Sequence, residues 1–516
     1  MLSRLVPSFY NVTLISPENF FLFTPLLAST AVGTVESRSI VEPIRNVTTR
    51  YKANYFCAEV KEVCIEESSV LCQTSQGQDF KVDYDFLVLA VGAEVNTFGC
   101  PGVNGKRDPP SLESPLCSAE YAIKLKKYED ARTIRRRITA NIEAAMIPTV
   151  DEASRKRMLT SVIVGGGPTG VEFAAELYDL IWQDFTQRYP QELLRDFRVI
   201  LVQSADHVLN TYDLTISQYA ESLFARHGID ILKNARVVAI KRDAVQYEEK
   251  VSDLLNKVSL SEIPYGICVW ATGIRMVPLI DKLSQLIPEQ VHNHALIVDD
   301  WLRIRGVPAK NLFALGDCAT VELPKLRPYF QKFLENQTSS IRVSDLSNFT
   351  ACMLRENPEL RIHYALLMKL VRKFSQNTDS VSPVVLDRLI QEVELSMRTL
   401  PATAQVAQQQ GRYLANQLNA LAINRITRGA GHSHLAESIK VIHPPFLYHH
   451  AGMSAYVGSH HTVLDLGKVV LADRYLAFWL WRSIYLSEQV SLRTRVMVAF
   501  DWTKTLLFGR DISSPV

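Results

Sequence analysis

Short apolar runs rich in β-branched residues recur along the chain, and most of them end at a glycine or a turn residue. The clearest run, Val162–Val164, predicts a buried strand, and the residues after it predict a helix over Val171–Leu180. Comparable patterns predict strands or strand pairs at Asn11–Ile15, Tyr55–Ile65, Ser69–Thr74, Tyr84–Val91, Phe197–Gln203, Ile229–Ile240, Gly266–Gly273 and Leu312–Asp317. Helical patterns separate several of these runs, so the sequence predicts an α/β fold.

Longer segments have helical periodicity. Ala119–Ala145 predicts a long charged helix, Thr34–Ile44 has the character of a helix start, and Ala220–His227 predicts another helix. Four more helices are predicted at Arg327–Leu334, Val343–Arg355, Ile362–Phe374 and Val384–Met397.

Near the C-terminus, Tyr475–Arg510 predicts two helices rich in tryptophan and other large apolar residues. The basic residues that flank or interrupt them are Arg474, Arg482, Arg493, Arg495, Lys504 and Arg510. Such helices are too charged to span a bilayer, but they suit its interface, with tryptophans at the level of the head groups. The alternative is that the same apolar faces form a dimer interface.

Glycines in a G-x-G-x-x-G spacing follow the Val162–Val164 strand. Gly165 permits the tight turn, Gly167 lets a pyrophosphate approach the backbone, and Gly170 lets the helix pack closely on the strand. The free N–H groups at the start of the helix attract phosphate. The context of strand, turn and helix therefore predicts a dinucleotide site, and the alternative is a glycine-rich turn in a non-binding α/β domain.

Bulk properties set broad limits. A chain of 516 residues is long enough for two or three domains, and its net charge of +2 gives no argument for a nucleic-acid partner. The eight cysteines include no C-x-x-C pair, which argues against a dithiol redox centre and a zinc site and predicts no bound metal. No apolar run reaches the roughly 18 residues of a transmembrane helix.

Several stretches together resemble one family. They are Tyr10–Pro25, Tyr84–Val103, Val162–Leu177, Val269–Gly273, Leu312–Ala319, Leu400–Ala415 and Trp479–Arg510. The chain is similar to the type II NAD(P)H:quinone oxidoreductases, the alternative, rotenone-insensitive NADH dehydrogenases. The resemblance implies a flavoprotein with two dinucleotide-binding domains, which transfers electrons from NADH or NADPH through FAD to ubiquinone at the membrane surface without pumping protons.

The resemblance also assigns sites. It implies FAD-binding positions at Ser16, Pro17, Ala90, Gly92, Ala93, Gly316, Asp317 and Ala319. It implies nicotinamide-nucleotide positions at Gly165, Gly167, Gly170, Gln203, Ala271 and Gly273. The A-Q-x-A-x-Q stretch implies that Gln405 and Gln409, four residues apart on one helix face, border the flavin and the quinone.

Two of these positions leave alternatives open. Glu172 faces the junction of nicotinamide, flavin and quinone in the family, or it is an acid in the first helical turn that interacts with the helix dipole. Gln203 stands where an acid would bind the ribose 2′-OH and repel a 2′-phosphate. Because Gln203 is neutral, we expect the chain to use NADPH, alongside NADH.

One departure from the family concerns the N-terminus. The family's FAD domain begins with its own glycine-rich turn, and residues 1–15 contain only what resembles the end of the following helix and the second strand. We expect that the sequence lacks the start of this domain, together with a mitochondrial presequence. The alternatives are a non-catalytic membrane-associated paralogue that has lost flavin, and a soluble flavin reductase with another acceptor, such as a ferredoxin.

An insertion interrupts the family core at residues 322–399. Its position and size are similar to the EF-hand insertion of externally facing mitochondrial members, but no D-x-[DN]-x-[DN]-G loop is present, and Asn377–Ser380 lacks the glycine. We therefore expect a helical insertion that binds calcium poorly. The insertion favours a peripheral location on the mitochondrial inner membrane, at the intermembrane-space face, and the family implies a homodimer.

The predicted domain organisation follows from these features. It comprises an FAD-binding domain in three parts (1–105, 301–321 and 400–440), an NAD(P)H-binding domain (106–300), the insertion (322–399) and a C-terminal region for membrane anchoring and dimerisation (441–516).

Overall fold

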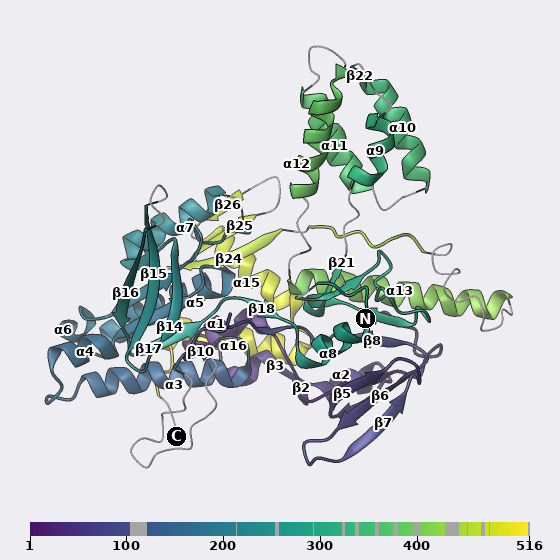
Figure 1. The fold of residues 1–516 in the computed structure, drawn as a ribbon. Helices are drawn as coiled ribbons and strands as arrows, with labels where there is room; N and C mark the ends of the chain where they lie inside the picture. The colour runs from purple at the N-terminus through teal and green to yellow at the C-terminus, as the bar shows by residue number, and fades with distance from the viewer. Residues whose placement is uncertain are drawn as a thin grey trace. The chain divides into compact units, whose positions relative to one another are not determined.

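The computed structural model describes the chain apart from residues 104–120, 213, 253–256, 293, 322–325, 336–339, 357–360, 375–379, 397–399, 401, 429–442, 451, 466–469, 474 and 514–516. The chain forms two compact units (Figure 1), each made of three separate segments. Unit 1 comprises Met1–Pro17, Thr48–Glu94 and Arg275–Tyr448, and unit 2 comprises Glu18–Val47, Val95–Ile274 and His449–Val516.

Unit 2 is built on a parallel five-stranded sheet. Its strand order is β10 (Ile123–Lys124), β17 (Ile267–Trp270), β11 (Thr160–Val164), β12 (Arg198–Val202) and β13 (Ile229–Leu232). All five residues of β11 are buried, as its β-branched sequence predicts for an internal strand. The helices of this unit are α1 (Leu27–Ala31), α3 (Tyr128–Ala145), α4 (Glu152–Met158), α5 (Pro168–Asp179), α6 (Gln191–Leu194) and α7 (Leu214–His227).

Smaller antiparallel sheets complete unit 2. They are β2 (Phe20–Leu22) with β3 (Val41–Pro43), then β14 (Ala235–Ile240), β15 (Ala244–Ser252) and β16 (Lys257–Pro264), and finally β24 (Met453–Gly458), β25 (His461–Asp465) and β26 (Val470–Asp473). Two C-terminal helices follow, α15 (Leu476–Glu488) and α16 (Leu492–Phe508). The main core of the unit joins Ile163, Phe173, Leu177 and Phe224, all fully buried, to Trp481 and Trp502 of these helices.

Unit 1 contains two parallel strand pairs, β1 (Thr13–Ser16) with β4 (Asn54–Cys57), and β8 (Leu87–Leu89) with β20 (Leu312–Ala314). A further parallel pair is β19 (Leu296–Val298) with β21 (Ala319–Val321), and an antiparallel sheet comprises β5 (Glu59–Cys64), β6 (Ser69–Gln73) and β7 (Asp79–Asp83). Outside the predicted insertion, the helices of this unit are α8 (Pro278–Leu286) and α13 (Ala404–Arg428). At the sequence boundaries between the units lie α2 (Ile44–Arg50), β9 (Glu94–Val95) and β18 (Ile274–Arg275).

The predicted insertion is a helical subdomain of unit 1 with a core of its own (Figure 1). It contains α9 (Arg327–Glu335), α10 (Val343–Glu356), α11 (Arg361–Phe374) and α12 (Pro383–Ser396). A short antiparallel pair joins β22 (Ile341–Arg342) to β23 (Ser380–Val381). Strand β22 connects α9 to α10, and β23 connects α11 to α12. The predicted Asn377–Ser380 segment lies outside the described residues except for Ser380.

Two predicted elements are wrong in detail. Thr34–Ile44 forms a 3-10 turn over Ser37–Ile40 and then strand β3, because Val41 and Glu42 pair with β2 rather than continue a helix. The predicted long helix Ala119–Ala145 begins only at Tyr128, and Ile123 and Lys124 form the edge strand β10 beside β17. Its first two residues lie outside the described part of the chain.

In the described part of the chain, none of the helices has the length and apolar character required to cross a bilayer.

Candidate functional site

The glycine-rich turn connects β11 to α5 in unit 2. Gly165 has φ +114°, and a Cβ there would lie 2.8 Å from the Ala271 carbonyl oxygen. A Cβ on Gly170 would lie 1.9 Å from the Gly165 carbonyl oxygen, so α5 can approach the turn only because this position is glycine. Around a Cβ built at Gly167, no atom of the described residues lies within 4 Å, which leaves the start of α5 open to a ligand.

The second predicted turn, Ala271–Gly273, lies directly beside this first one. The Ala271 N–H donates to the Val164 carbonyl oxygen at 2.9 Å, and the Asn96 N–H donates to the Gly273 carbonyl oxygen at 3.1 Å. The indole N–H of Trp270 donates to the carbonyl oxygens of Thr272 and Asn96, which fixes the turn further. The structure therefore brings Gly165, Gly170 and Ala271 together at the carboxyl ends of β11 and β17, where dinucleotides bind in open α/β sheets.

Gln203 follows β12 and has only 7% of its surface exposed. Its side-chain oxygen accepts a hydrogen bond from the Gly166 N–H at 3.1 Å, and its side-chain nitrogen donates to the His207 carbonyl oxygen at 3.0 Å. Gln203 thus holds the glycine-rich turn against the loop that follows β12.

Glu172 is the fifth residue of α5 and is buried, with 8% exposure. Its side chain accepts a hydrogen bond from the Tyr456 N–H at 3.3 Å. Burial raises the pKa of this carboxyl to about 8, and the Glu176 carboxylate adds to the shift. No acid lies in the first turn of α5, so the interpretation of Glu172 as a first-turn acid on the helix dipole is wrong.

Sequence reasoning missed a buried charge network on the same helix. Glu176 accepts hydrogen bonds from the hydroxyls of Ser29 (2.6 Å) and Thr34 (2.7 Å), and Arg510 approaches it at 3.4 Å. Arg510 also pairs with Asp184 at 2.8 Å. These partners are more than 140 residues apart in the chain, and those of Arg510 more than 300, so the sequence carries no local signal of the network.

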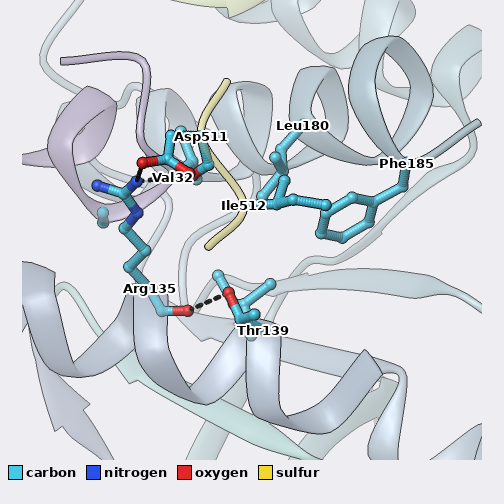
Figure 2. Close-up of a pocket in the computed structure, with 9 residues that line it drawn as sticks. Val32, Arg135, Thr139, Leu180, Phe185, Asp511 and Ile512 are labelled. Carbon is cyan, nitrogen blue, oxygen red and sulfur yellow. Dashed lines mark hydrogen bonds and ion pairs between the residues drawn. The ribbon is translucent and has the colours of Figure 1, made fainter. Parts of the chain in front are cut away.

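A small pocket of unit 2 lies under the C-terminal segment (Figure 2). Its lining includes Val32, Leu180 and Phe185, and Arg135 donates to the Asp511 carbonyl oxygen at 2.6 Å beside it. None of the predicted site residues lines this pocket, so it is separate from the glycine-rich turn.

In unit 1, the predicted FAD-binding residues that follow β8 and β20 come together. The parallel pairing of Leu89 with Ala314, and the bond from the Leu315 N–H to the Leu89 carbonyl oxygen at 3.0 Å, place Ala90 and Gly316 at the same end of this strand pair. Asp317 lies in a 3-10 turn, and Ala319 begins β21. Near a Cβ built at Gly92, no atom of the described residues lies within 4 Å.

In another part of unit 1, Ser16 is the last residue of β1, where it pairs with Cys57 of β4, and Pro17 follows it. The Ser16 carbonyl oxygen accepts from the Ala58 N–H at 3.1 Å, which fixes the end of β1 beside β4. This is the strand end at which the resemblance places the adenosine ribose of FAD. Ala93, at the other predicted FAD segment, is buried.

Helix α13 carries the predicted glutamines. The side-chain oxygen of Gln405 accepts from the Tyr448 hydroxyl, and Gln409 is half-buried. A neighbouring residue that sequence reasoning missed, Gln410, is 2% exposed and accepts from the Gly316 N–H at 2.7 Å. Gln410 therefore fixes the turn after β20 to α13, and its only sequence signal was its place in a run of glutamines.

Comparisons with known proteins define the class first. Residues 3–340 match the family described as pyridine nucleotide-disulphide oxidoreductase, and residues 450–511 match the NDH2 C-terminal domain. The solved structure of NDH2 from Plasmodium falciparum in complex with NADH superimposes with a TM-score of 0.80 at 26% identity, and the match covers 99% of this chain and 96% of that one.

Curated relatives narrow the class to a family. The external alternative NAD(P)H-ubiquinone oxidoreductase B4, mitochondrial, of Arabidopsis thaliana is 35% identical over 98% of this chain and 85% of its own length. The external NADH-ubiquinone oxidoreductase 2, mitochondrial, of Saccharomyces cerevisiae is 33% identical over 99% and 79%. The chain belongs to the family of alternative NAD(P)H-ubiquinone oxidoreductases, the type II NADH dehydrogenases. The predicted family and the predicted two-domain flavoprotein fold are confirmed.

Proposed function

We propose that this chain is an FAD-dependent enzyme that transfers electrons from NADH or NADPH to ubiquinone at a membrane surface, without pumping protons. The observation that carries the proposal is the open glycine-rich turn between β11 and α5, in a chain that matches NAD(P)H-ubiquinone oxidoreductases along its whole length. FAD bound to this chain would supply the redox chemistry that links oxidation of the nicotinamide to two-electron reduction of the quinone.

The nicotinamide nucleotide would bind unit 2 at the paired turns. The open backbone at Gly167 and the start of α5 suit a pyrophosphate, while Gly165, Gly170 and Ala271 allow the two turns to lie close together. Gln203 stabilises the turn through Gly166. A neutral residue at this position supports use of NADPH beside NADH.

FAD would bind unit 1. The open backbone at Gly92, the Gly316–Asp317 turn and the strand end at Ser16 and Pro17 fit the parts of a nucleotide that need close backbone approach and hydrogen-bond acceptors. In this proposal, Ala90, Ala93 and Ala319 line the same site without adding charge.

Quinone reduction takes up two protons as well as two electrons, and Glu172 and the α13 glutamines suit that chemistry. With its pKa raised to about 8 by burial, Glu172 holds a proton at neutral pH and can donate it. The neutral amides of Gln405 and Gln409 can hydrogen-bond a quinone head group without an unpaired charge.

A peripheral membrane surface on α15 and α16 is supported by the apolar side chains that these helices expose. They are Leu476, Trp479, Leu480, Leu492, Val496, Phe500, Leu506, Leu507 and Phe508. Several of the basic residues that sequence reasoning assigned to this surface are used inside the protein instead. Arg510 is buried, and Arg482 stacks on Phe478 at 4.3 Å, while Arg474 lies outside the described residues.

Vesicle binding tests this surface. Phe500 is 67% exposed on α16, and Leu260, 61% exposed on β16, provides a matched control. We expect Phe500→Glu to reduce co-sedimentation with vesicles of phosphatidylcholine and an anionic lipid, and Leu260→Glu to leave it unchanged. Equal binding of both variants would exclude α16 as the membrane surface. Light scattering of the same proteins without vesicles would test the proposed homodimer.

The relatives' names support a mitochondrial location, and we propose the inner membrane at its intermembrane-space face. The domain boundaries given above, at 105, 300, 321, 399 and 440, remain part of the proposal. The insertion is proposed as a degenerate EF-hand-like subdomain that binds calcium poorly, since its sequence contains no D-x-[DN]-x-[DN]-G loop.

The absorption spectrum of the purified protein, recorded before and after anaerobic addition of NADPH, tests the proposed function. We expect a flavin band that bleaches with NADPH. Absence of flavin from the full-length protein would refute an FAD enzyme and favour a non-catalytic paralogue. A flavin band that bleaches with NADH alone would retain the enzyme but exclude NADPH as a substrate.

A further inference from the structure

The Gln203 amide, at the position where the family selects between NAD and NADP, is occupied by bonds to the protein. Its oxygen accepts from the Gly166 N–H and its nitrogen donates to the His207 carbonyl oxygen. The side chain is 7% exposed. Because both polar atoms of this buried amide bind the protein backbone, we expect a neighbouring residue, and not Gln203, to contact the adenosine ribose.

The loop after Gln203 is held at several points. The Asn234 N–H donates to the Ala205 carbonyl oxygen at 3.0 Å, and the Leu209 N–H donates to the Gly166 carbonyl oxygen at 2.7 Å. The Val208 N–H donates to the Glu221 carboxylate at 3.1 Å, and Glu221 pairs with Lys233 at 3.0 Å. These bonds on both sides hold the backbone of residues 205–209 in place.

Asp206 and His207 lie in this braced loop. The Asp206 side chain is 77% exposed, and its carboxylate oxygen lies 2.5 Å from the Nδ1 atom of His207, whose side chain is 27% exposed. The loop follows the carboxyl end of β12, which is where the ribose of a bound dinucleotide lies in this class of fold. The loop thus presents a carboxylate and an imidazole in contact with each other at the ribose-binding end of the strand.

We infer that the Asp206–His207 pair, and not Gln203, sets the preference of this enzyme between NADPH and NADH. The inference rests on the proposed function. The Asp206 carboxylate accepts a hydrogen bond from a ribose 2′-OH and repels a 2′-phosphate. His207 reduces that repulsion because its Nδ1 atom contacts the carboxylate.

Substitutions that change the charge of the pair test this assignment. We expect Asp206→Asn to raise the ratio of kcat/KM for NADPH to that for NADH by about tenfold, and His207→Ala to lower it by a similar factor. Asp230→Asn is the matched control, because Asp230 is an exposed acid of the same sheet that pairs with Arg198. We expect it to leave the ratio unchanged.

A binding measurement separates this inference from the proposed function. Calorimetry with adenosine 2′,5′-bisphosphate and with AMP needs no electron transfer, and Asp206→Asn should strengthen binding of the bisphosphate about tenfold while leaving AMP within about twofold. If both Asp206→Asn and His207→Ala leave the ratios unchanged while Gln203→Glu lowers them, Gln203 is the selector and the inference is wrong. If the wild type oxidises neither nucleotide, the proposed function fails while the binding result still stands.

Discussion

Removing the Arg510 side chain should loosen the attachment of the C-terminal helices to the rest of unit 2. The guanidinium donates to Asp184 at 2.8 Å and to the Thr34 hydroxyl at 2.8 Å, and it lies 3.4 Å from Glu176. The side chains of Arg510, Glu176 and Asp184 are about 5% exposed or less. Arg510→Met would therefore leave the buried Glu176 carboxylate without its cation, and would leave Asp184 with Arg188 alone, 3.3 Å away.

The size of the effect follows from this burial. Breaking a buried ion pair by removing one partner costs about 3–5 kcal/mol, because the other charge stays buried and uncompensated. Ser29, Thr34 and the Arg510 backbone N–H still donate to these carboxylates, so we expect the lower half of this range. A cost of about 3 kcal/mol corresponds to roughly a hundredfold rise in the fraction of opened protein.

Hydrogen exchange of the α16 amides measures this opening directly. We expect roughly hundredfold faster exchange over α16 in Arg510→Met, together with a lower melting temperature. Arg198→Met is the control, since Arg198 pairs with Asp230 in the same unit with both side chains 48% exposed or more. Such exposed pairs contribute about 0–1 kcal/mol. Equal exchange in the two variants would refute the claim that the buried network holds α16 in place.

Three further predictions concern the site. Gly170→Ala should abolish nucleotide binding, because its Cβ would lie 1.9 Å from the Gly165 carbonyl oxygen. Gly167→Ala should fold normally and only weaken NADH binding, because its Cβ meets no atom within 4 Å in the described part of the chain. Equal losses of binding by the two variants in calorimetry would contradict these different roles of the two glycines. Glu172→Gln should become more stable relative to wild type as the pH rises from about 4.5 toward 8, by about 3 kcal/mol at pH 7. In this range the Glu172 carboxyl ionises in the unfolded wild-type chain but stays protonated in the folded one, which lowers the free energy of unfolding of the wild type only. Melting temperatures of the two proteins with the same pH dependence would exclude the raised pKa. Gln410→Ala should lower flavin content, since it removes the partner of the Gly316 N–H, and unchanged flavin absorbance would contradict this.

Local patterns in the sequence predict the strand and the helix that carry the glycine-rich turn of unit 2. The strand β11 and the helix α5 follow from a β-branched run and from glycine spacing, which act over neighbouring residues. The predicted ends of the four insertion helices agree with the structure to within a residue or two, because the apolar positions of these helices repeat with the helical period.

Features that depend on distant partners could not be predicted in this way. The two-residue strand β10 forms because it can pair with β17. The Thr34 hydroxyl donates to Glu176 and accepts from Arg510, and each of these partners is more than 140 residues away in the chain. On α13, spacing placed Gln405 and Gln409 on one face, but it could not tell that the adjacent Gln410 contacts Gly316. The roles of the predicted site residues stay predictions.

Electron transfer from the reduced flavin to quinone tests the proposed function. The full-length protein is reduced anaerobically with one equivalent of NADH, and a short-chain ubiquinone is then added while the flavin absorbance is followed. We expect the flavin band to bleach with NADH and to return in full with the ubiquinone, with one quinol formed per NADH. A band that bleaches with NADH but stays bleached in the presence of the quinone would contradict the assignment as an NAD(P)H-ubiquinone oxidoreductase.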